Sequence, residues 1–190
     1  MNRHPTNLYS VETVVQLDKT AIQSGIPGYT LMSRAGDACW QCLQSRWPAA
    51  RSLQVLCGTG NNGGDGFIVA RLALAAGWQV RVLQLGEAER LQGDALTACD
   101  DYLAAGGQIA PFSGRVALEA DVLVDAMLGT GTDRPLAGDW QRAAERINAA
   151  PVPVLSVDIP SGLQSDTGSV PGVAVHADVT VTFIGRKTGL

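Results

Sequence analysis

The chain has 190 residues, a formal net charge of −4 and an isoelectric point near 5.0, and 46% of its residues are hydrophobic. A chain of this length can form one domain with a substantial core, and its scattered lysines and arginines exclude a basic surface for nucleic acid. The apolar runs are strand-sized and no apolar signal segment follows residues 1–7, so we expect a cytoplasmic protein without a membrane partner.

Two helices are predicted before the first strand. Ser10 is a suitable cap for a helix that has Glu12 in its first turn and ends at Gly25. Pro27 begins a second helix, which ends before Pro48. Cys39 and Cys42 imitate a redox motif in this second helix, but we interpret them as core residues because they share a helical apolar side. That side also contains Leu31, Ala35, Ala38 and Leu43.

Strands and helices alternate through the rest of the chain. The predicted strands are 53–57, 79–85, 121–127, 153–158 and 178–183, with a weaker one near 108–112. The predicted helices between them are 66–76, 91–105 and 137–149. This alternation predicts a parallel sheet covered by helices on both faces, with ligands bound beyond the carboxyl ends of the strands.

A glycine-rich segment, residues 58–66, follows the first of these strands. Its five glycines allow close approach of a ligand, and amide hydrogens at the start of a helix attract anions, so a nucleotide phosphate is the expected ligand. Gly58, Gly60 and Gly63 match the dinucleotide fingerprint only weakly, and the carboxylate of Asp65 would repel a phosphate unless a cation or hydroxyl intervenes. Glu87 could contact a ribose, but we interpret it as a surface acid.

Two aspartates interrupt apolar strands near their carboxyl ends. Asp125 lies in the run 121–128 and Asp158 in the run 154–159, and a small-residue turn follows each of them. A lone acid in such a position often caps a helix, but two acids together with a glycine loop predict a shared polar site. Gly129, Thr130 and Gly131 offer a second anion contact or only a tight turn.

Several of these motifs resemble the YjeF N-terminal domain family, the NAD(P)H-hydrate epimerases. The resemblance rests on residues 60–66, 124–131 and 158–163, and residues 31–36, 177–183 and Lys187 follow the family pattern in the same order. It covers nearly the whole chain. It implies a Rossmann-like three-layer α/β/α fold with a mostly parallel sheet and two N-terminal helices, a homodimer, and an isomerase that interconverts the C6 epimers of hydrated NADH and NADPH in metabolite repair.

The resemblance also implies site residues. Carried over position by position, the substrate contacts are Asn61, Asn62, Gly63, Gly64, Asp65, Gly129, Thr130, Gly131, Thr132, Asp133, Arg134, Pro135 and Asp158. The potassium ligands are Asn62, Asp125 and Ser161. Oxygen ligands of this kind suit a hard cation, and a cation there would offset the acids beside a phosphate.

The epimerisation chemistry requires a proton donor and acceptor but no hydride acceptor. Loss of the C6 hydroxyl as water leaves an iminium ion, which water can attack from either face. Our hypothesis is that Asp158 is the acid and base while Asp125 holds the cation, although the sequence leaves the reverse assignment open. Asp158 can also stabilise the developing positive charge on the ring.

Other interpretations come from other classes of protein. A nicotinamide-dependent oxidoreductase would need a proton relay that the strand ends do not offer. A non-catalytic scaffold of the same fold is the main alternative. We expect residues 1–190 to form one epimerase domain. The sequence leaves open whether it is a fragment lacking the final strand and an ADP- or ATP-dependent dehydratase domain, which nothing here resembles, and whether the NADH or the NADPH hydrate is preferred.

Overall fold

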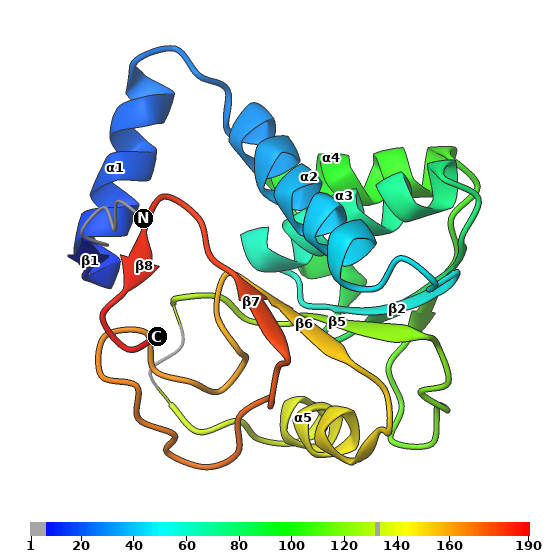
Figure 1. Cartoon of the computed structure of the whole chain (residues 1–190). Helices are drawn as coiled ribbons and strands as arrows, with labels where there is room; N and C mark the ends of the chain where they lie inside the picture. Colours follow the sequence, from blue (N-terminus) through cyan, green and yellow to red (C-terminus); the bar gives the residue numbers. More distant parts are fainter. Residues whose placement is uncertain (1–6, 132–133) are drawn as a thin grey trace.

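A computed structural model describes residues 7–131 and 134–190 of the chain. Within this part, six parallel strands form one sheet in the order β4-β3-β2-β5-β6-β7 (Figure 1). The strands are β2 (Ser52–Cys57), β3 (Gln79–Gln84), β4 (Ile109–Pro111), β5 (Val122–Ala126), β6 (Val154–Val157) and β7 (Val179–Val181). The chain proceeds outward from β2 to one edge, returns to β5 and continues to the other edge, which is the doubly wound order of dinucleotide-binding folds.

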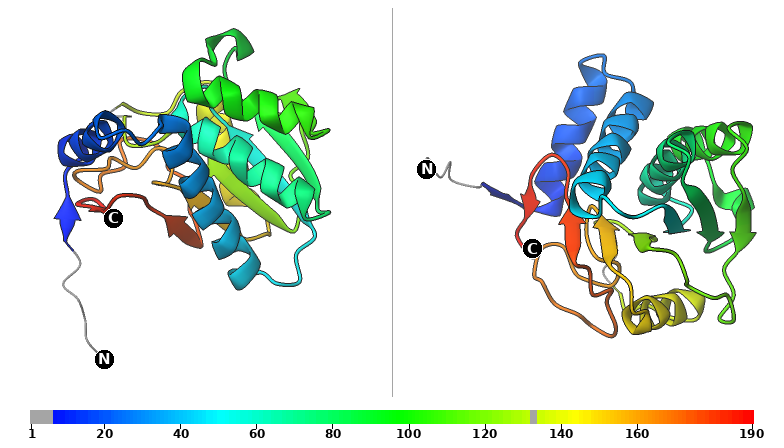
Figure 2. Two further views of the ribbon diagram at one scale, coloured as in Figure 1. Left: turned by 90° about the horizontal axis from the view of Figure 1, so that it is seen from above. Right: turned by 45° about the vertical axis from the view of Figure 1, so that its right-hand side comes forward.

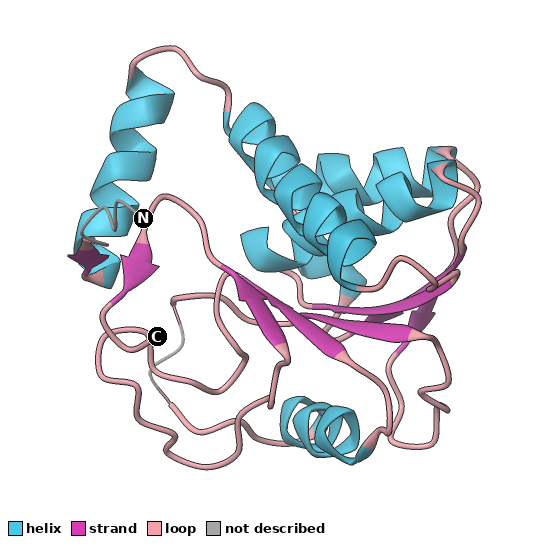
Figure 3. Cartoon of the chain, in the orientation of Figure 1, coloured by secondary structure: helices cyan, strands magenta, loops and turns pink. Residues whose placement is uncertain are grey.

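The sheet lies between two helical layers (Figure 3). Helices α2 (Gly28–Arg46), α3 (Asn61–Ala75) and α4 (Gly93–Ala104) cover one face, and α5 (Asp139–Ala149) covers the other with long loops beside it. A short 3₁₀ turn, η1 (Ala88–Arg90), precedes α4. Strand side chains alternate between a core beneath α2, α3 and α4 and a second core beneath α5. The predicted three-layer Rossmann-like fold is confirmed.

Helix α1 (Val11–Gln23) stands beside the main body (Figure 2). The predicted cap is confirmed, since the hydroxyl of Ser10 accepts a hydrogen bond from the Thr13 amide at 3.2 Å. Of the residues of α1, all of which the structure describes, Val14 alone is buried. No helix in the described part of the chain has the length and apolarity needed to cross a membrane.

A two-residue strand pair lies beside α1 and was not predicted. Strand β1 (Leu8–Tyr9) pairs in parallel with β8 (Arg186–Lys187), so Tyr9 is opposite Lys187. Two-residue strands are too short for a periodic hydrophobic pattern, and their pairing depends on contacts between distant parts of the chain. This pair fixes where Lys187 enters the fold.

The predicted start of the helix after β2 was wrong. We expected the helix at 66–76, but α3 begins at Asn61, so residues 61–65 form its first turn rather than a loop. Glycine has low helix propensity, which concealed this turn in the sequence. Close packing explains it: a Cβ on Gly63 would lie 2.0 Å from the carbonyl oxygen of Gly58, and a Cβ on Gly64 would lie 2.6 Å from the Met32 side chain.

The cysteine interpretation is confirmed for Cys39, which is buried in the core beneath α2. Cys42 is half-buried and packs against the same core. Burial raises the pKa of both thiols, which keeps them protonated and unreactive. The predicted place of Ala38 on this apolar side was wrong, because Ala38 is exposed.

Candidate functional site

The candidate site lies where the carboxyl ends of β2, β5 and β6 meet. Strands β2 and β5 are neighbours in the sheet, although their connections run in opposite directions, so this is the topological switch point. The amide of Gly58, just after β2, donates to the carbonyl of Ala126 at the end of β5 at 3.1 Å. A Cβ on Gly58 would lie only 2.0 Å from the Met127 carbonyl oxygen. The two strand ends therefore meet backbone against backbone.

The first turn of α3 begins at this point. Gly60 is the N-cap residue, and because glycine has no side chain it gives the turn no capping hydrogen bond. The first amides of a helix have no partner within the helix, and the helix dipole makes this end electropositive. Asn61 is exposed there, whereas Asn62, Gly63 and Gly64 are buried. This turn is suited to bind an anion such as a phosphate.

The side-chain amide of Asn62 has polar atoms without partners. Its Oδ1 and Nδ2 atoms are both buried, and neither forms a hydrogen bond with the described residues. Gly129 packs directly against it, because a Cβ on Gly129 would lie 3.4 Å from Asn62 Cβ and 3.6 Å from its Oδ1. A buried amide without partners is costly, so this arrangement points to a ligand that provides them.

Asp125 lies fully buried at the end of β5 and accepts hydrogen bonds at both carboxylate oxygens. Oδ2 accepts from the Ser156 hydroxyl at 2.9 Å and the Ser161 amide at 2.8 Å. Oδ1 accepts from the Ser161 hydroxyl at 2.6 Å and the Met127 amide at 3.2 Å. Burial raises the pKa of Asp125, and these donors oppose that shift. The Leu128 amide donates to the Ser161 hydroxyl at 3.0 Å, which links this cluster to the segment before Gly129.

Asp158 follows β6 in a strained backbone conformation. Its φ is +65°, and the amide of Ile159 donates to the carbonyl of Val157 at 2.8 Å across it. This is a γ-turn with a positive central φ, the rarer and more strained form. Such a conformation costs about 1–3 kcal/mol and occurs most often at functional sites. The turn directs the carboxylate of Asp158, whose side chain is 15% exposed, toward Lys187.

The Lys187 side chain forms a buried ion pair with Asp158. Its Nζ donates to Asp158 Oδ1, to the Thr182 hydroxyl at 2.8 Å and to the Phe183 carbonyl at 3.1 Å. The sequence interpretation did not place Lys187 in the site. Its signal was the lone lysine after the last predicted strand. The pairing of β6 with β7, where the Asp158 amide donates to the Val181 carbonyl at 2.8 Å, brings the segment that carries Lys187 beside Asp158, and Lys187 itself lies in the pairing of β8 with β1.

Asp65, in the first turn of α3, is electrostatically coupled to Asp158. Burial raises the pKa of Asp65 well above its usual value, the charges of Asp158 and Asp18 raise it further, and Lys187 opposes them. Asp65 therefore keeps its proton at a pH where an exposed aspartate has lost it. A neutral Asp65 does not repel a phosphate, which answers the objection raised by its position in the glycine-rich segment.

Replacing Asp65 with asparagine is expected to change how stability depends on pH. The unfolded chain releases this proton at a lower pH than the folded chain, so the free energy of unfolding falls as the pH rises from the ordinary aspartate pKa toward the raised one. Asp65→Asn should flatten this fall, which begins as the pH rises above the ordinary aspartate pKa of about 4. Urea unfolding across this range measures it, with the exposed Asp100→Asn as control. An unchanged slope for Asp65→Asn would contradict the prediction.

Only some of the predicted substrate-binding residues in the segment 129–135 lie at the site. Gly129 contacts Asn62, and Thr130 is half-buried beside it in sequence. Gly131, Arg134 and Pro135 are exposed, and among the described residues no hydrogen bond ties the Arg134 side chain to the site. Thr132 and Asp133 lie outside the described residues. Glu87 is confirmed as a surface acid, since it is exposed and pairs with Arg90 at 3.2 Å.

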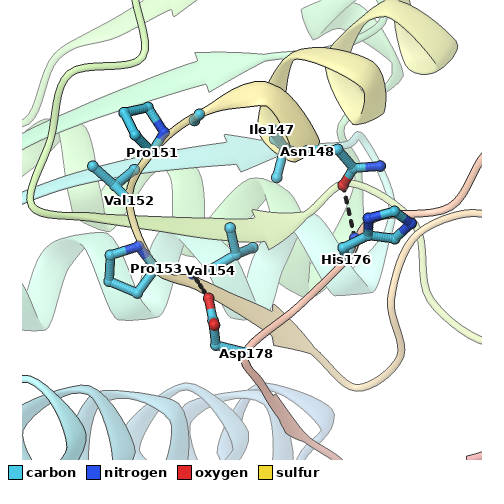
Figure 4. A pocket seen from close by; sticks show the side chains of 9 residues that line it. Ile147, Asn148, Pro151, Val152, Pro153, Val154, His176 and Asp178 are labelled. Carbon is cyan, nitrogen blue, oxygen red and sulfur yellow. Dashed lines mark hydrogen bonds between the residues drawn. The ribbon is translucent and has the colours of Figure 1, made fainter.

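A separate hollow of about 380 Å³ lies between the end of α5 and the start of β6 (Figure 4). It is at the amino ends of the strands, away from the polar cluster. Two of its polar side chains are already bonded: Asn148 Oδ1 accepts from the His176 amide at 2.7 Å, and the Asp178 carboxylate accepts from the Val154 amide at 2.8 Å. These bonds hold the segment before β7 against the end of α5 and the start of β6, so the two side chains have a structural role.

The fold and this edge of the sheet define a domain of the Rossmann-like class with a polar site at its topological switch point. The chain belongs to the family described as YjeF-related protein N-terminus, whose model matches residues 28–189. The resemblance inferred from the motifs is therefore confirmed.

The chain is also similar to two curated relatives and to one solved structure. It is 43% identical to the NAD(P)H-hydrate epimerase of Limosilactobacillus fermentum over 90% of this chain and 82% of that protein. It is 42% identical to the bifunctional NAD(P)H-hydrate repair enzyme Nnr of Coxiella burnetii over 97% of this chain but only 38% of that protein. The crystal structure of yeast YNL200c has the same fold, with a TM-score of 0.85 at 23% identity, covering 96% of this chain and 82% of that one.

Proposed function

We propose that the chain is an isomerase that interconverts the R and S epimers at C6 of hydrated NADH and NADPH, in repair of nicotinamide nucleotides. The proposal rests on one juxtaposition: the anion-binding first turn of α3 and the carboxylate of Asp158 lie at the same edge of the sheet, coupled through Asp65. The relatives named as NAD(P)H-hydrate epimerase support it.

Asp158 is proposed as the group that carries the proton. In the protonated form of Asp158, the carboxyl proton passes to the departing C6 hydroxyl, so the C–O bond breaks, water leaves and the ring nitrogen supplies the electron pair for the iminium bond. Water then attacks C6 from the other face and returns its extra proton to the carboxylate. One proton is given and one recovered, so the cycle needs no redox partner. The negative charge of the resulting carboxylate also stabilises the cationic ring.

The first turn of α3 is proposed to bind the nucleotide phosphates. Asn61, Asn62, Gly63, Gly64 and Asp65 form this turn. The amides that precede Gly64 favour an anion, since the Gly64 amide is the first that donates within the helix, to the Gly60 carbonyl at 3.1 Å. Residues 129–135, which follow β5, are proposed to complete the nucleotide contacts, with Gly129 already beside Asn62.

The residues around Asn62 suit a potassium ion. The buried Oδ1 of Asn62 lacks a partner, and Asp125 and Ser161 provide further oxygen atoms next to the segment that contacts it. Hard cations prefer ligands of this kind. We propose that Asn62, Asp125 and Ser161 hold the ion, which when bound supplies positive charge that offsets the phosphates and the acids nearby.

Potassium is expected to raise the thermal unfolding temperature of the wild type and to have no such effect on Asn62→Leu. Leucine is close in size to asparagine but has no oxygen for the ion, and it removes the unpaired buried amide. The measurement is thermal unfolding in potassium chloride and in choline chloride at equal ionic strength. Asn61→Leu, at the exposed neighbouring position, is the control and should respond as the wild type does. An equal response of all three proteins would exclude Asn62 as a ligand.

The function is tested by chromatography of the separated epimers of hydrated NADH after incubation with the purified protein, with and without potassium. Equilibration of either epimer supports the proposal. Binding of the hydrate without equilibration would favour the non-catalytic scaffold, and a protein that neither binds nor equilibrates the hydrate would contradict the proposal as a whole.

Three further parts of the function are proposed with it. Residues 1–190 form a single epimerase domain, and its product is consumed by a fused or separate ADP- or ATP-dependent dehydratase, which the bifunctional relatives support.

The domain is a homodimer. Exposed apolar side chains along and beside α1 support an interface there: Leu8, Val15, Leu17, Ile22 and Ile184.

A further inference from the structure

Lys187 is a fully buried cation that contacts Asp158, the residue proposed as both acid and base. Its side chain is 1% exposed, and its three hydrogen bonds reach Asp158, Thr182 and Phe183. An ammonium group is rarely buried so completely without a specific partner, because it loses its hydration. Here the partner is the carboxylate of Asp158, so the two side chains form one unit.

All hydrogen bonds to the Asp158 side chain from the described residues reach the same oxygen. Oδ1 accepts from Lys187 Nζ, from the Thr182 hydroxyl at 3.3 Å and from the Phe183 amide at 3.4 Å. No described residue donates a hydrogen bond to Oδ2. A proton added to this carboxylate is therefore directed to Oδ2, since the lone pairs of Oδ1 already face donors.

The backbone on both sides of this ion pair is held in an uncommon conformation. Among the described residues, Asp158 and Ile184 are the non-glycine residues with positive φ, at +65° and +63°. The Gly185 amide donates to the Phe183 carbonyl at 2.6 Å across Ile184, which makes a second strained γ-turn. That turn leads the chain into β8, and directly after β8 the Thr188 amide donates to the Tyr9 carbonyl at 3.1 Å. Strain of this kind persists only where the surrounding structure fixes it.

We propose that Lys187 is a positioning residue for the epimerase reaction, which anchors Oδ1 of Asp158 and leaves Oδ2 as the oxygen that exchanges the proton with the C6 hydroxyl and the attacking water. The pairing of β1 with β8 holds the lysine in place. This inference rests on the proposed function. It predicts that a side chain outside the nucleotide contacts controls the chemical step rather than substrate binding.

The test compares kcat and KM for hydrated NADH in the wild type, Lys187→Met, Lys187→Arg and Arg186→Met. Methionine keeps the length and apolar stem of lysine but removes the donor, so kcat should fall about 100-fold while KM changes less than about threefold. Arginine restores a donor and should recover part of kcat. Arg186 lies on the same strand but is exposed, so Arg186→Met should keep the wild-type kcat.

Thr182→Val provides a second test with little risk to folding, because valine has the shape of threonine. It removes a hydroxyl that bridges Lys187 and Asp158, and kcat should fall about fivefold with KM unchanged. If Lys187→Met does not fold, this variant decides between the outcomes.

The results separate this inference from the proposed function. A wild type that does not equilibrate the epimers overturns both. An active wild type with an undiminished kcat in Lys187→Met, or in Thr182→Val if that methionine variant is unfolded, overturns the role of Lys187 alone. An equal loss of kcat in Lys187→Met and Arg186→Met also overturns it, because the loss would then result from disturbing β8 rather than from removing the lysine amine.

Discussion

Replacing Asp158 with asparagine is expected to slow epimer interconversion by about 10³-fold, because the amide cannot give or take the proton. Asparagine is one of the few residues that adopts a positive φ readily, so the γ-turn at this position should survive. The fold should be retained with a lower free energy of unfolding, by about 3 kcal/mol, since the buried ammonium of Lys187 loses its anionic partner.

Three measurements on Asp158→Asn distinguish a chemical from a structural effect. Circular dichroism should match the wild type, and hydrate binding by calorimetry should be little changed, while the chromatographic assay shows the loss of epimerisation. Asp178→Asn is a useful control, because Asp178 has a carboxylate that accepts a backbone amide at the opposite end of β6. Wild-type rates in Asp158→Asn would transfer the catalytic role to another group, with Asp125 as the alternative that the sequence left open.

Substituting alanine for Gly63 is expected to destroy the first turn of α3. The new Cβ would lie 2.0 Å from the carbonyl oxygen and 2.7 Å from the carbonyl carbon of Gly58, and both contacts are with backbone that cannot move aside cheaply. We expect a loss of about 3 kcal/mol in unfolding free energy. We also expect weaker binding of the nucleotide by about 100-fold, equivalent to about 2.7 kcal/mol, as the amides of the turn are displaced.

Gly60→Ala is the matched control, since it lies in the same segment with no atom within 4 Å of the added Cβ and with a φ of −96°. Its binding and stability should stay close to the wild type. Urea unfolding and calorimetry with ADP-ribose or NADH measure both effects. Equal behaviour of the two alanine variants would mean that Gly63 is not held in close backbone contact in solution.

Much of the fold could be predicted because local patterns and long-range packing agree. Strand β2 was expected at 53–57 and is found at Ser52–Cys57, and the weak strand near 108–112 is found at Ile109–Pro111. The start of α3 could not be predicted in this way. Residues 61–66 include three glycines, and only their contacts with Gly58, Met32 and Ala126 explain why a helix forms there.

The site was harder to predict than the fold. The position of Asp125 and Asp158 at strand ends was visible as acids within apolar runs, and the parallel sheet brings those ends together. The hydrogen-bond partners of these two aspartates could not be predicted from the sequence. Ser156 lies on the strand next to Asp125, and Lys187 reaches Asp158 from the segment after β7, which pairs with β6. These contacts join residues far apart in the chain, so they leave no local pattern.

The position of the site between β2 and β5 has a consequence for folding. The segment from β2 to β4 and the segment from β5 to β7 each form local crossovers, but the contact between them closes a long loop, with Leu53 opposite Val122. Long-range pairing of parallel strands forms slowly. Because Asn62 and Gly129 come from the two different segments, the site exists only after these segments have docked. A ligand that contacts both segments would stabilise the assembled domain. It would slow local opening between β2 and β5 and so protect the chain there from proteolysis.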